Sequence, residues 1–356
     1  MMRKLALLAL LLAAAAGGAS FWMYQRVHAP YQGYQAPEQF VDVPPGADSR
    51  AIGDQLVAAG VLPDPITFRV GLWLRGRARQ LRAGEYRFDS PMTPLDVNDK
   101  LARGDIYVVN LTFPEGLTIA EMAKVFEGRG FGTAASFVAA ASDPALIRAL
   151  DPAARDLEGY LFPETYSLPR HADASALVRQ MVDRFEHAFT PELRAAAAAR
   201  GLSVRQAVTL ASIVEKETAK PEERPLIAAV YQNRLRRGIG LQCDPTVIYA
   251  LMRLGKYTGN LRRVDLALDS PYNTYRYRGL PPGAIAAPGL ASLEAAVKPA
   301  DVDYLYFVSR NDGTHVFSKS LRDHERAVDE FQRRRRTRGP AASAEASPSP
   351  APAAVK

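Results

Sequence analysis

The stretch Ser203–Thr218, SVRQAVTLASIVEKET, predicts a helix that carries a glutamate on its apolar face. Ser203 and Gln206 form a capping box at its start, and Pro221 marks its end. At about 3.6 residues per turn, Glu215 falls within an apolar stripe made of Val204, Ala207, Val208, Ala211 and Val214. A carboxyl group facing a packed, partly dry surface is disfavoured as an anion, so its pKa is expected to rise. A general acid that works near neutral pH requires this property.

The other polar residues of this helix gather on another side. They are Arg205, Thr209, Ser212 and Lys216, and Glu217 points roughly away from Glu215. A second interpretation of the pattern is a structural ion pair, in which an arginine or backbone donors hold a glutamate that has no chemistry. The rest of the sequence is needed to choose between the two.

The N-terminal segment predicts a membrane-spanning helix. Leu5–Tyr24 carries no charge and is rich in Leu and Ala, and about 20 such residues span the ~30 Å hydrocarbon core of a bilayer. Arg3 and Lys4 precede it, which keeps the N-terminus in the cytoplasm and exports the rest. A signal peptide cleaved near Ala16–Ser20 is the alternative. We predict that residues 1–25 form a cytoplasmic tip and a retained anchor.

The composition argues against several classes of function. Cys243 is the only cysteine, so no internal disulfide can form, and no histidine lies near it in sequence to activate it as a nucleophile. The five histidines show no metal-ligand spacing and no phosphate-binding glycine loop is present, so we predict neither a metal nor a cofactor. Part of the net charge of +7 lies in residues 333–356, which predict a disordered basic and Ala/Pro/Ser-rich tail. We expect this exported chain to meet anionic lipid or wall polymer and no nucleic acid.

Two segments of the chain repeat one another. Val41–Gly46, VDVPPG, corresponds to Leu111–Gly116, LTFPEG, and the match continues as far as Val61 and Phe131. Each copy predicts a short strand, a Pro/Gly turn, a capped helix and a Gly terminator. The first copy continues through a second helix to a strand at Gly84–Phe88. This strand–helix–helix–strand order over residues 38–108 resembles a wall-binding module of LysM type, and a simple spacer domain is the alternative.

Residues 109–332 predict a mixed domain, which makes the whole chain α+β. We expect a helix at Glu222–Arg237, and another that opens with Asp244 as N-cap and Pro245 in its first turn. A turn at Asn311–Gly313 between two short strands predicts a late hairpin.

Two loops of this domain carry residues suited to carbohydrate. Leu157–Tyr166, LEGYLFPETY, is aromatic, interrupted by Gly and Pro, and contains two acidic residues. Ser270–Ile285 combines three tyrosines, an asparagine and several prolines, which suits a stiff loop lining a cleft. Aromatic faces stack on pyranose rings and carboxylates bind their hydroxyls. Ordinary loop packing on the core is the alternative for both.

Five blocks of the sequence, taken together, resemble one family. In order they are Leu210–Thr218, Asn233–Leu235, Leu241–Tyr249, Tyr272–Tyr275 and Gly279–Ile285. They are similar to the signature blocks of the endolytic murein transglycosylases, the YceG-like family, and the likeness runs from about Pro44 to His324. Cys243 departs from the pattern, because a polar residue such as Thr often precedes the Asp-Pro pair.

The resemblance implies a single-pass enzyme of the inner membrane, with its catalytic domain in the periplasm. Such an enzyme cleaves the MurNAc–GlcNAc bond inside peptidoglycan strands and leaves 1,6-anhydro-MurNAc ends. It would work beside peptidoglycan synthases, where it would terminate nascent strands. The catalytic glutamate of the family maps onto Glu215. One carboxyl group is enough for this reaction because the attacking C6 hydroxyl is tethered to the substrate.

A hydrolase acting on the same substrate is the first alternative, and it generally needs a second carboxylate. Of the candidates, Glu217 should face away, Asp244 is expected to cap a helix, and Glu164 has no predicted position. A wall-binding scaffold without activity is the second alternative. For substrate contacts we predict Tyr166, Glu164, Gln242, Asn273 and Tyr275.

Overall fold

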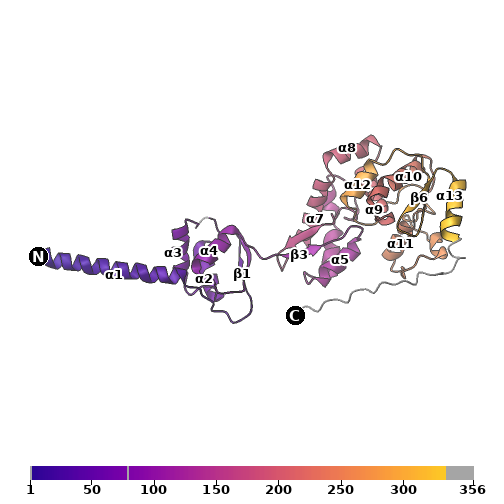
Figure 1. Cartoon of the computed structure of the whole chain (residues 1–356). Coiled ribbons are helices and arrows are strands. Elements are labelled where there is room, and N and C mark those ends of the chain that lie inside the picture. The colour runs from indigo at the N-terminus through magenta and orange to yellow at the C-terminus, as the bar shows by residue number, and fades with distance from the viewer. Residues whose placement is uncertain (1, 78–79, 334–356) are drawn as a thin grey trace, which may run out of the picture. The chain divides into compact units, whose positions relative to one another are not determined.

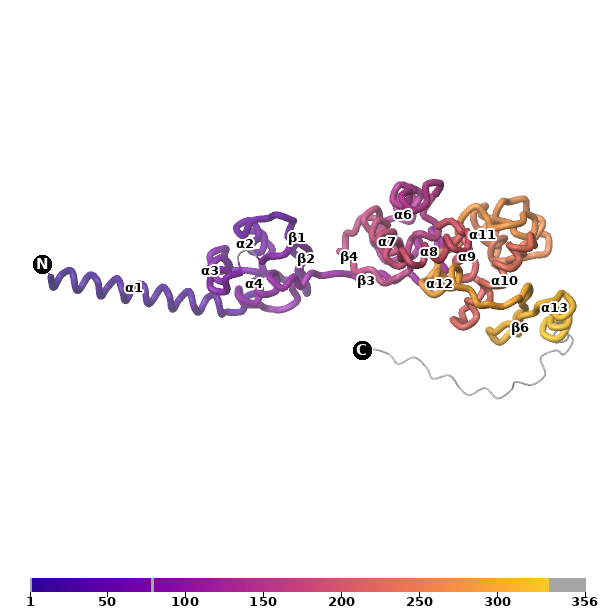
Figure 2. Tube along the Cα trace, turned by 90° about the horizontal axis from the view of Figure 1, so that it is seen from above, coloured from indigo at the N-terminus to yellow at the C-terminus, as the bar shows by residue number. Residues whose placement is uncertain are grey.

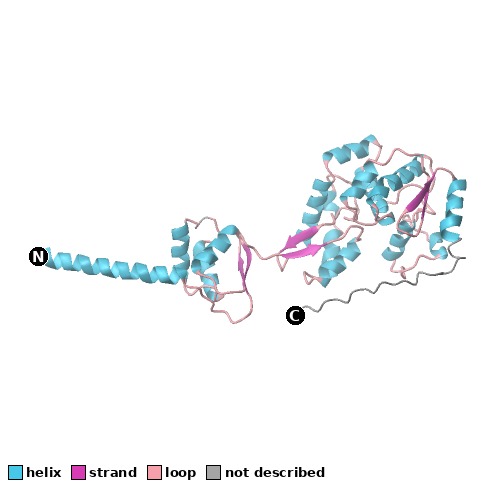
Figure 3. Ribbon diagram, viewed as in Figure 1, coloured by secondary structure: helices cyan, strands magenta, loops and turns pink. Residues whose placement is uncertain are grey.

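The structure is a computed structural model that describes residues 2–77 and 80–333. Its chain divides into two compact units, of which the first contains Met1–Asn110 and Tyr166–Ala172. The second unit contains Leu111–Thr165 and Asp173–Lys356. Helices predominate in both units, with strands paired in twos (Figures 1 and 3). The predicted α+β class is confirmed. Of the predicted tail, 333–356, Arg333 ends a short helix and residues 334–356 lie outside the described residues.

The first unit begins with the long apolar helix α1, Met2–His28. A window of this helix reaches a mean hydropathy of 2.0 and is fully exposed, so the helix is long and apolar enough to cross a membrane. Its last turn is different. Val27 is buried there, and Arg26 Nη2 donates to Asp64 Oδ2 at 2.7 Å. The C-terminal end of α1 is therefore part of the folded unit.

The rest of the first unit has the predicted strand–helix–helix–strand order. Its elements are β1 (Gln39–Val43), α2 (Ser49–Ala58), α3 (Pro65–Arg75), β2 (Gly84–Phe88) and the additional helix α4 (Pro94–Arg103). The strands β1 and β2 pair antiparallel, with Gln39 opposite Phe88 and Val43 opposite Gly84. Val41, Val43 and Tyr86 of this sheet pack with Leu56 and Phe68 of the helices in one core. The likeness to a LysM module stays a prediction.

The predicted repeat is confirmed element by element. The second copy forms β3 (Val109–Thr112) and α5 (Ile119–Gly128), as the first forms β1 and α2. The turn glycines Gly46 and Gly116 have nearly the same left-handed φ, 80° and 78°. Thr118 forms the predicted capping box with Glu121, since the hydroxyl accepts from Glu121 N at 3.2 Å. The strand β3 pairs with β4 (Thr165–Leu168) where the chain passes between the units.

The second unit is built around one central helix, α9 (Val204–Glu217). The other helices are α6 (Ala134–Ala141), α7 (Ala174–Ala188), α8 (Pro191–Ala199), α10 (Arg224–Arg236), α11 (Asp244–Arg253), α12 (Leu290–Val297) and α13 (Leu321–Val328). Helices α8, α10, α11 and α12 all contact α9, which lies among them in Figure 2. The predicted hairpin forms as β5 (Tyr306–Ser309) and β6 (His315–Ser318). Short single-turn helices occupy Pro144–Ile147, Pro221–Glu223, Arg263–Ala267 and Asp329–Arg333.

The helix α9 has the predicted start but a different environment. The capping box of Ser203 with Gln206 is confirmed, with the Ser203 hydroxyl 3.2 Å from Gln206 N. The polar side of the helix is covered as well, because Thr209 and Ser212 are as deeply buried as the apolar stripe. Ser212 Oγ donates to Thr209 O and accepts from Ile285 N at 3.0 Å, which satisfies it inside the protein. Neighbours on all sides make α9 a core helix instead of an amphipathic surface helix.

Candidate active site

Glu215 lies in the last turn of α9, where three helices meet. Its side chain is only 6% exposed, and Oε1 accepts from Arg224 Nη2 at 3.2 Å. Oε2 accepts from Gly289 N at 3.0 Å. Arg224 is the first residue of α10, and Gly289 is the N-cap residue of α12, which has no side-chain cap of its own. The glutamate therefore satisfies a free N–H at the positive end of a helix, where a negative charge is stabilised.

A second carboxyl group, Glu115, lies against Glu215. It comes from the Pro-Glu-Gly turn after β3, and its Oε2 is 3.5 Å from Arg224 Nη2. Burial raises the pKa of Glu115, the negative charge of Glu215 raises it further, and Arg224 opposes both effects. The two carboxyl groups are close enough to share a hydrogen bond. Arg224 thus contacts two acids that are far apart in sequence.

The sequence contains one signal for Glu115 outside the family motifs. In the repeated block the first copy has Pro45 at the central position of the turn, and the second copy has Glu115 there. A charged residue that replaces a turn proline in only one of two equivalent turns is a candidate for function, because the turn itself does not need it.

Backbone and lysine contacts fix the Glu115 turn in place. Lys216 Nζ donates to Gly116 O at 2.9 Å, so the residue after Glu215 holds the residue after Glu115. Gly116 N donates to Ala287 O at 2.8 Å, and Ala287 N donates back to Leu117 O at 2.8 Å. These bonds join the turn to the segment that leads into Gly289.

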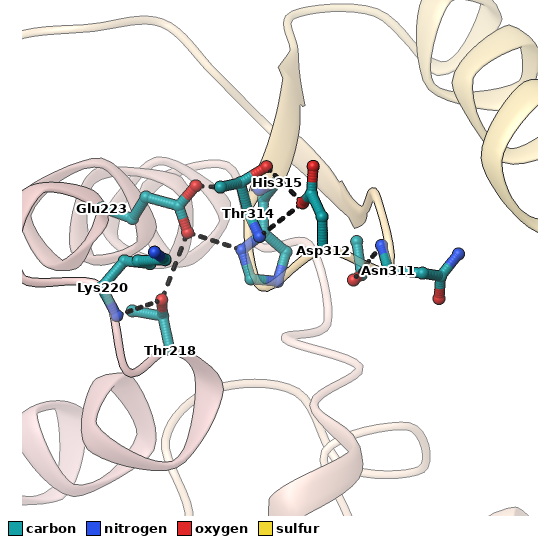
Figure 4. Close-up of polar contacts among 8 residues, drawn as sticks. Thr218, Lys220, Glu223, Asn311, Asp312, Thr314 and His315 are labelled. Carbon is teal, nitrogen blue, oxygen red and sulfur yellow. Dashed lines mark hydrogen bonds and ion pairs between the residues drawn. The ribbon is translucent and has the colours of Figure 1, made fainter. Parts of the chain in front are cut away.

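A polar network orients the connection between α9 and α10 (Figure 4). Glu223, the residue before Arg224, accepts from His315 N at 2.8 Å and from Thr218 Oγ1 at 3.2 Å. Its second contact to His315 is through Nδ1, at 2.7 Å. Burial opposes the charged form of Glu223, but the His315 bonds outweigh it and lower the pKa of the carboxyl group. Thr218 also accepts from Lys220 N, so the whole connection is braced against the late hairpin.

Three of the predicted substrate residues lie on two neighbouring loops. Gln242 N donates to Thr274 O at 3.2 Å, which joins the loop before α11 to the loop that carries Asn273 and Tyr275. Asn273 is fully buried, and its Nδ2 donates to Leu266 O and Leu268 O. This placement gives Asn273 a structural role. Gln242 and Tyr275 are exposed, so they remain available to a ligand.

The remaining predicted carboxylates have other partners. Asp244 was expected to cap α11, but Cys243 is the N-cap residue, and Asp244 is the first helical residue and accepts from Tyr275 Oη at 2.6 Å. Glu164 forms an ion pair with Arg184. Glu217 accepts from Tyr231, and burial raises its pKa. Tyr166 is buried and belongs to the first unit.

Cys243 has none of the features of a nucleophile. It is 1% exposed, and burial raises the pKa of its thiol, so the reactive thiolate is disfavoured.

A cavity of about 480 Å³ lies beside Glu158, a residue of the aromatic segment. Glu158 is almost fully buried, and its two oxygens accept from Ile119 N and from Tyr249 Oη, each at 3.1 Å. Burial raises the pKa of Glu158 to about 8. The residues that line the cavity include Lys124, Tyr249, Arg253 and Tyr257.

Residues 41–330, which contain this arrangement, match the family model described as the YceG-like family. The chain belongs to the YceG-like family. An endolytic murein transglycosylase of Bacillus subtilis is 31% identical over 308 residues, which cover 82% of this chain and 84% of that protein. A Streptococcus pneumoniae protein of the same name is 32% identical, and there the match covers 82% of this chain and 58% of the relative.

A solved structure of the same family supports the fold. The crystal structure of a putative yceG-like protein from Listeria monocytogenes superposes with a TM-score of 0.56 at 30% identity. The match covers 82% of this chain and 98% of that one.

Proposed function

We propose that this chain is a membrane-anchored endolytic murein transglycosylase in which Glu215 is the catalytic acid and base. Family membership and the name of the matched relatives support the reaction class. The observation that carries the choice of residue is the setting of Glu215, a nearly buried carboxyl group between Arg224 and the N-terminus of α12.

The reaction needs one group that gives a proton and takes one back. Protonated Glu215 donates its proton to the glycosidic oxygen between MurNAc and GlcNAc, and the C1–O bond breaks as positive charge develops at the muramyl C1. The resulting carboxylate takes the proton of the C6 hydroxyl as O6 bonds to C1. The products are a free GlcNAc end and a 1,6-anhydro-MurNAc end, no water is consumed, and Glu215 is again protonated.

The spacing of the two carboxyl groups favours this reaction over hydrolysis. Hydrolases place two carboxyl groups on opposite sides of the scissile bond, about 5–5.5 Å apart for retention and about 6.5–9.5 Å for inversion. Glu115 and Glu215 are close enough to hydrogen-bond and bind one arginine together. A sugar cannot be accommodated between groups in contact, so Glu115 does not have the position of a hydrolytic base or nucleophile.

The other parts of the chain fit a periplasmic enzyme of the inner membrane. Helix α1 is proposed as a retained single-pass anchor, and the first unit as a LysM-like wall-binding domain. Gln242 and Tyr275 are proposed as substrate contacts, with Glu164 and Tyr166 as further candidates. Cleavage beside peptidoglycan synthases would terminate nascent strands.

The test compares wild type with Glu215→Gln, using the full-length protein in detergent and purified peptidoglycan. Mass spectrometry of the products should show anhydro-muramyl ends for wild type and a loss of at least about 100-fold for the variant, because amide replaces the proton carrier. Glu294→Gln, an exposed change on α12, is the matched control and should cleave normally.

Other outcomes have distinct meanings. Reducing ends from wild type would show a hydrolase. Equal cleavage by wild type and a folded Glu215→Gln variant would show that Glu215 is not the catalytic residue. If wild type bound the strands without cleaving them, the protein would be a wall-binding scaffold.

A further inference from the structure

Four groups from three segments lie around Glu115 and the turn that carries it. Glu215 and Lys216 come from α9, Arg224 from α10, and the Gly289 N–H from the start of α12. Lys216 donates to the Gly116 carbonyl, whereas Arg224 Nη2 contacts both acids, at 3.5 Å from Glu115 Oε2 and 3.2 Å from Glu215 Oε1. Two carboxylates beside a single arginine leave one negative charge in excess.

Two acids that touch each other cannot both be charged at low cost, because like charges at hydrogen-bond distance repel strongly when partly buried. A single shared proton removes the repulsion and supplies the hydrogen bond between them. With that proton, the two carboxyl groups and Arg224 are together neutral. The geometry therefore selects a pair that carries one proton.

We propose that Glu115 is a positioning residue for the reaction, which shares one proton with Glu215 and so keeps Glu215 supplied with the proton it donates. This inference rests on the proposed function of Glu215. As the proton leaves for the glycosidic oxygen, the pair becomes doubly negative, and the mutual repulsion then favours return of a proton from the C6 hydroxyl. The pair ends with the one proton it had at the start.

Gly289 supports this inference independently. Its φ of −76° is ordinary for any residue, so the backbone does not demand glycine there. The limited space around it does require glycine. A Cβ at Gly289 would lie 1.8 Å from Glu115 Oε1 and 2.1 Å from Glu115 Cδ. Glycine at this position leaves room for a second carboxylate beside Glu215.

Two variants displace the same carboxylate in different ways. Glu115→Gln removes its charge and keeps its shape. Gly289→Ala keeps Glu115 but pushes its flexible end away, since the three atoms nearest to the added Cβ all belong to the Glu115 carboxyl group. The matched controls are Glu294→Gln on the exposed side of α12 and Gly128→Ala, where an added Cβ meets nothing within 4 Å.

The first measurement is the pH dependence of kcat with full-length protein and peptidoglycan. Both variants should lose the proton donor earlier as the pH rises, so the alkaline limb should move down by about one pH unit or more, which is a tenfold loss of kcat on that limb. KM should change little. A purely structural role would lower activity equally at all pH values, and an unchanged profile in Glu115→Gln would also overturn the proposal.

The second measurement does not depend on activity. In protein with ¹³C-labelled glutamate carboxyl groups, NMR should show a titration above the ordinary glutamate range, besides those of Glu158 and Glu217, that disappears in Glu115→Gln. It should move back toward that range in Glu215→Gln, while the signals of Glu158 and Glu217 stay unchanged. Absence of such a titration in wild type would rule out the shared proton. A failure of the proposed function is distinguishable from this result, because the Glu215→Gln variant would then still cleave peptidoglycan.

Discussion

Opposing influences meet at Glu215. Its nearly buried carboxyl group lies beside the Glu115 carboxyl group, and its two oxygens accept from Arg224 and from the Gly289 N–H. A residue that acts as an acid in one half of a reaction and as a base in the other must be able to adopt both the protonated and the charged form. A simple structural ion pair has no use for the second carboxyl group, so the arrangement argues against that interpretation.

Glu158 is a second buried glutamate and provides a prediction that does not involve catalysis. Burial raises its pKa from 4.5 to about 8. Between those values the folded protein keeps a proton that the unfolded chain has released, so the free energy of unfolding falls as the pH rises. The expected slope from this one group is about −1.4 kcal/mol per pH unit, present from about pH 4.5 to about pH 8 and absent above it.

Glu158→Gln should remove this slope, because the amide is neutral at every pH. Denaturant unfolding of wild type and variant across that pH range would measure it, and Glu294→Gln should keep the wild-type slope. If the two stability curves ran parallel, Glu158 would be ionised in the folded protein, contrary to its burial.

At the level of single residues, the sequence predicted what is local. The capping residues Ser203 and Thr118 and the turn at Asn311–Gly313 were predictable because their partners lie within a few positions. The partners of Glu215 were not, since Gly289 is 74 positions away and comes close only through packing of α12 on α9. Asp244 was assigned to the wrong role for the same reason, because its partner Tyr275 is 31 positions away.

At the scale of elements, the position of α9 depends on how its neighbours pack. The helical period identified one apolar stripe and placed the small polar residues Thr209 and Ser212 on another side of the helix. The structure buries them under other segments of the unit, and the hydrogen bond from Ile285 N to Ser212 Oγ satisfies the hydroxyl. Periodicity measures polarity around a helix and cannot show that a polar side is covered.

Gly159 is the point where the aromatic segment crosses close to α9. Its φ is +84°, and an added Cβ would lie 2.4 Å from Ala284 Cβ and 2.9 Å from Val208 Cγ1. Gly159→Ala should therefore cost about 2–5 kcal/mol of unfolding free energy, from left-handed strain of about 1–2 and overpacking of about 1–3.

Gly201→Ala is the matched control for this change. Gly201 also has a left-handed φ, +72°, but an added Cβ there meets nothing within 4 Å. It should lose only the strain, about 1–2 kcal/mol, in the same denaturation experiment. Equal losses in the two variants would mean that the aromatic segment does not pack tightly on α9.

At the scale of the whole molecule, α1 is the element with two environments. Its 27 residues extend for about 40 Å at ~1.5 Å per residue, more than the ~30 Å hydrocarbon core requires. Phe21, Trp22 and Tyr24 are exposed near the end of the apolar run, where aromatic side chains suit a membrane interface. Beyond them Val27 and Arg26 are already part of the first unit, so the apolar run of α1 and the folded unit are joined without a flexible linker.

This continuity makes the retained anchor a testable prediction. The full-length chain, expressed in bacteria, should stay in the membrane fraction under alkaline extraction, and mass spectrometry of that fraction should detect the N-terminal peptide intact. Replacing Leu8 and Leu11 with arginine should reduce membrane insertion, because each arginine near the centre of a spanning helix costs about 2.5–3.5 kcal/mol. A soluble product that begins near Ser20 would instead identify a cleaved signal peptide. The first unit would then keep Val27 and its bond between Arg26 and Asp64, so the cut would release a folded protein from the membrane and leave its site unchanged.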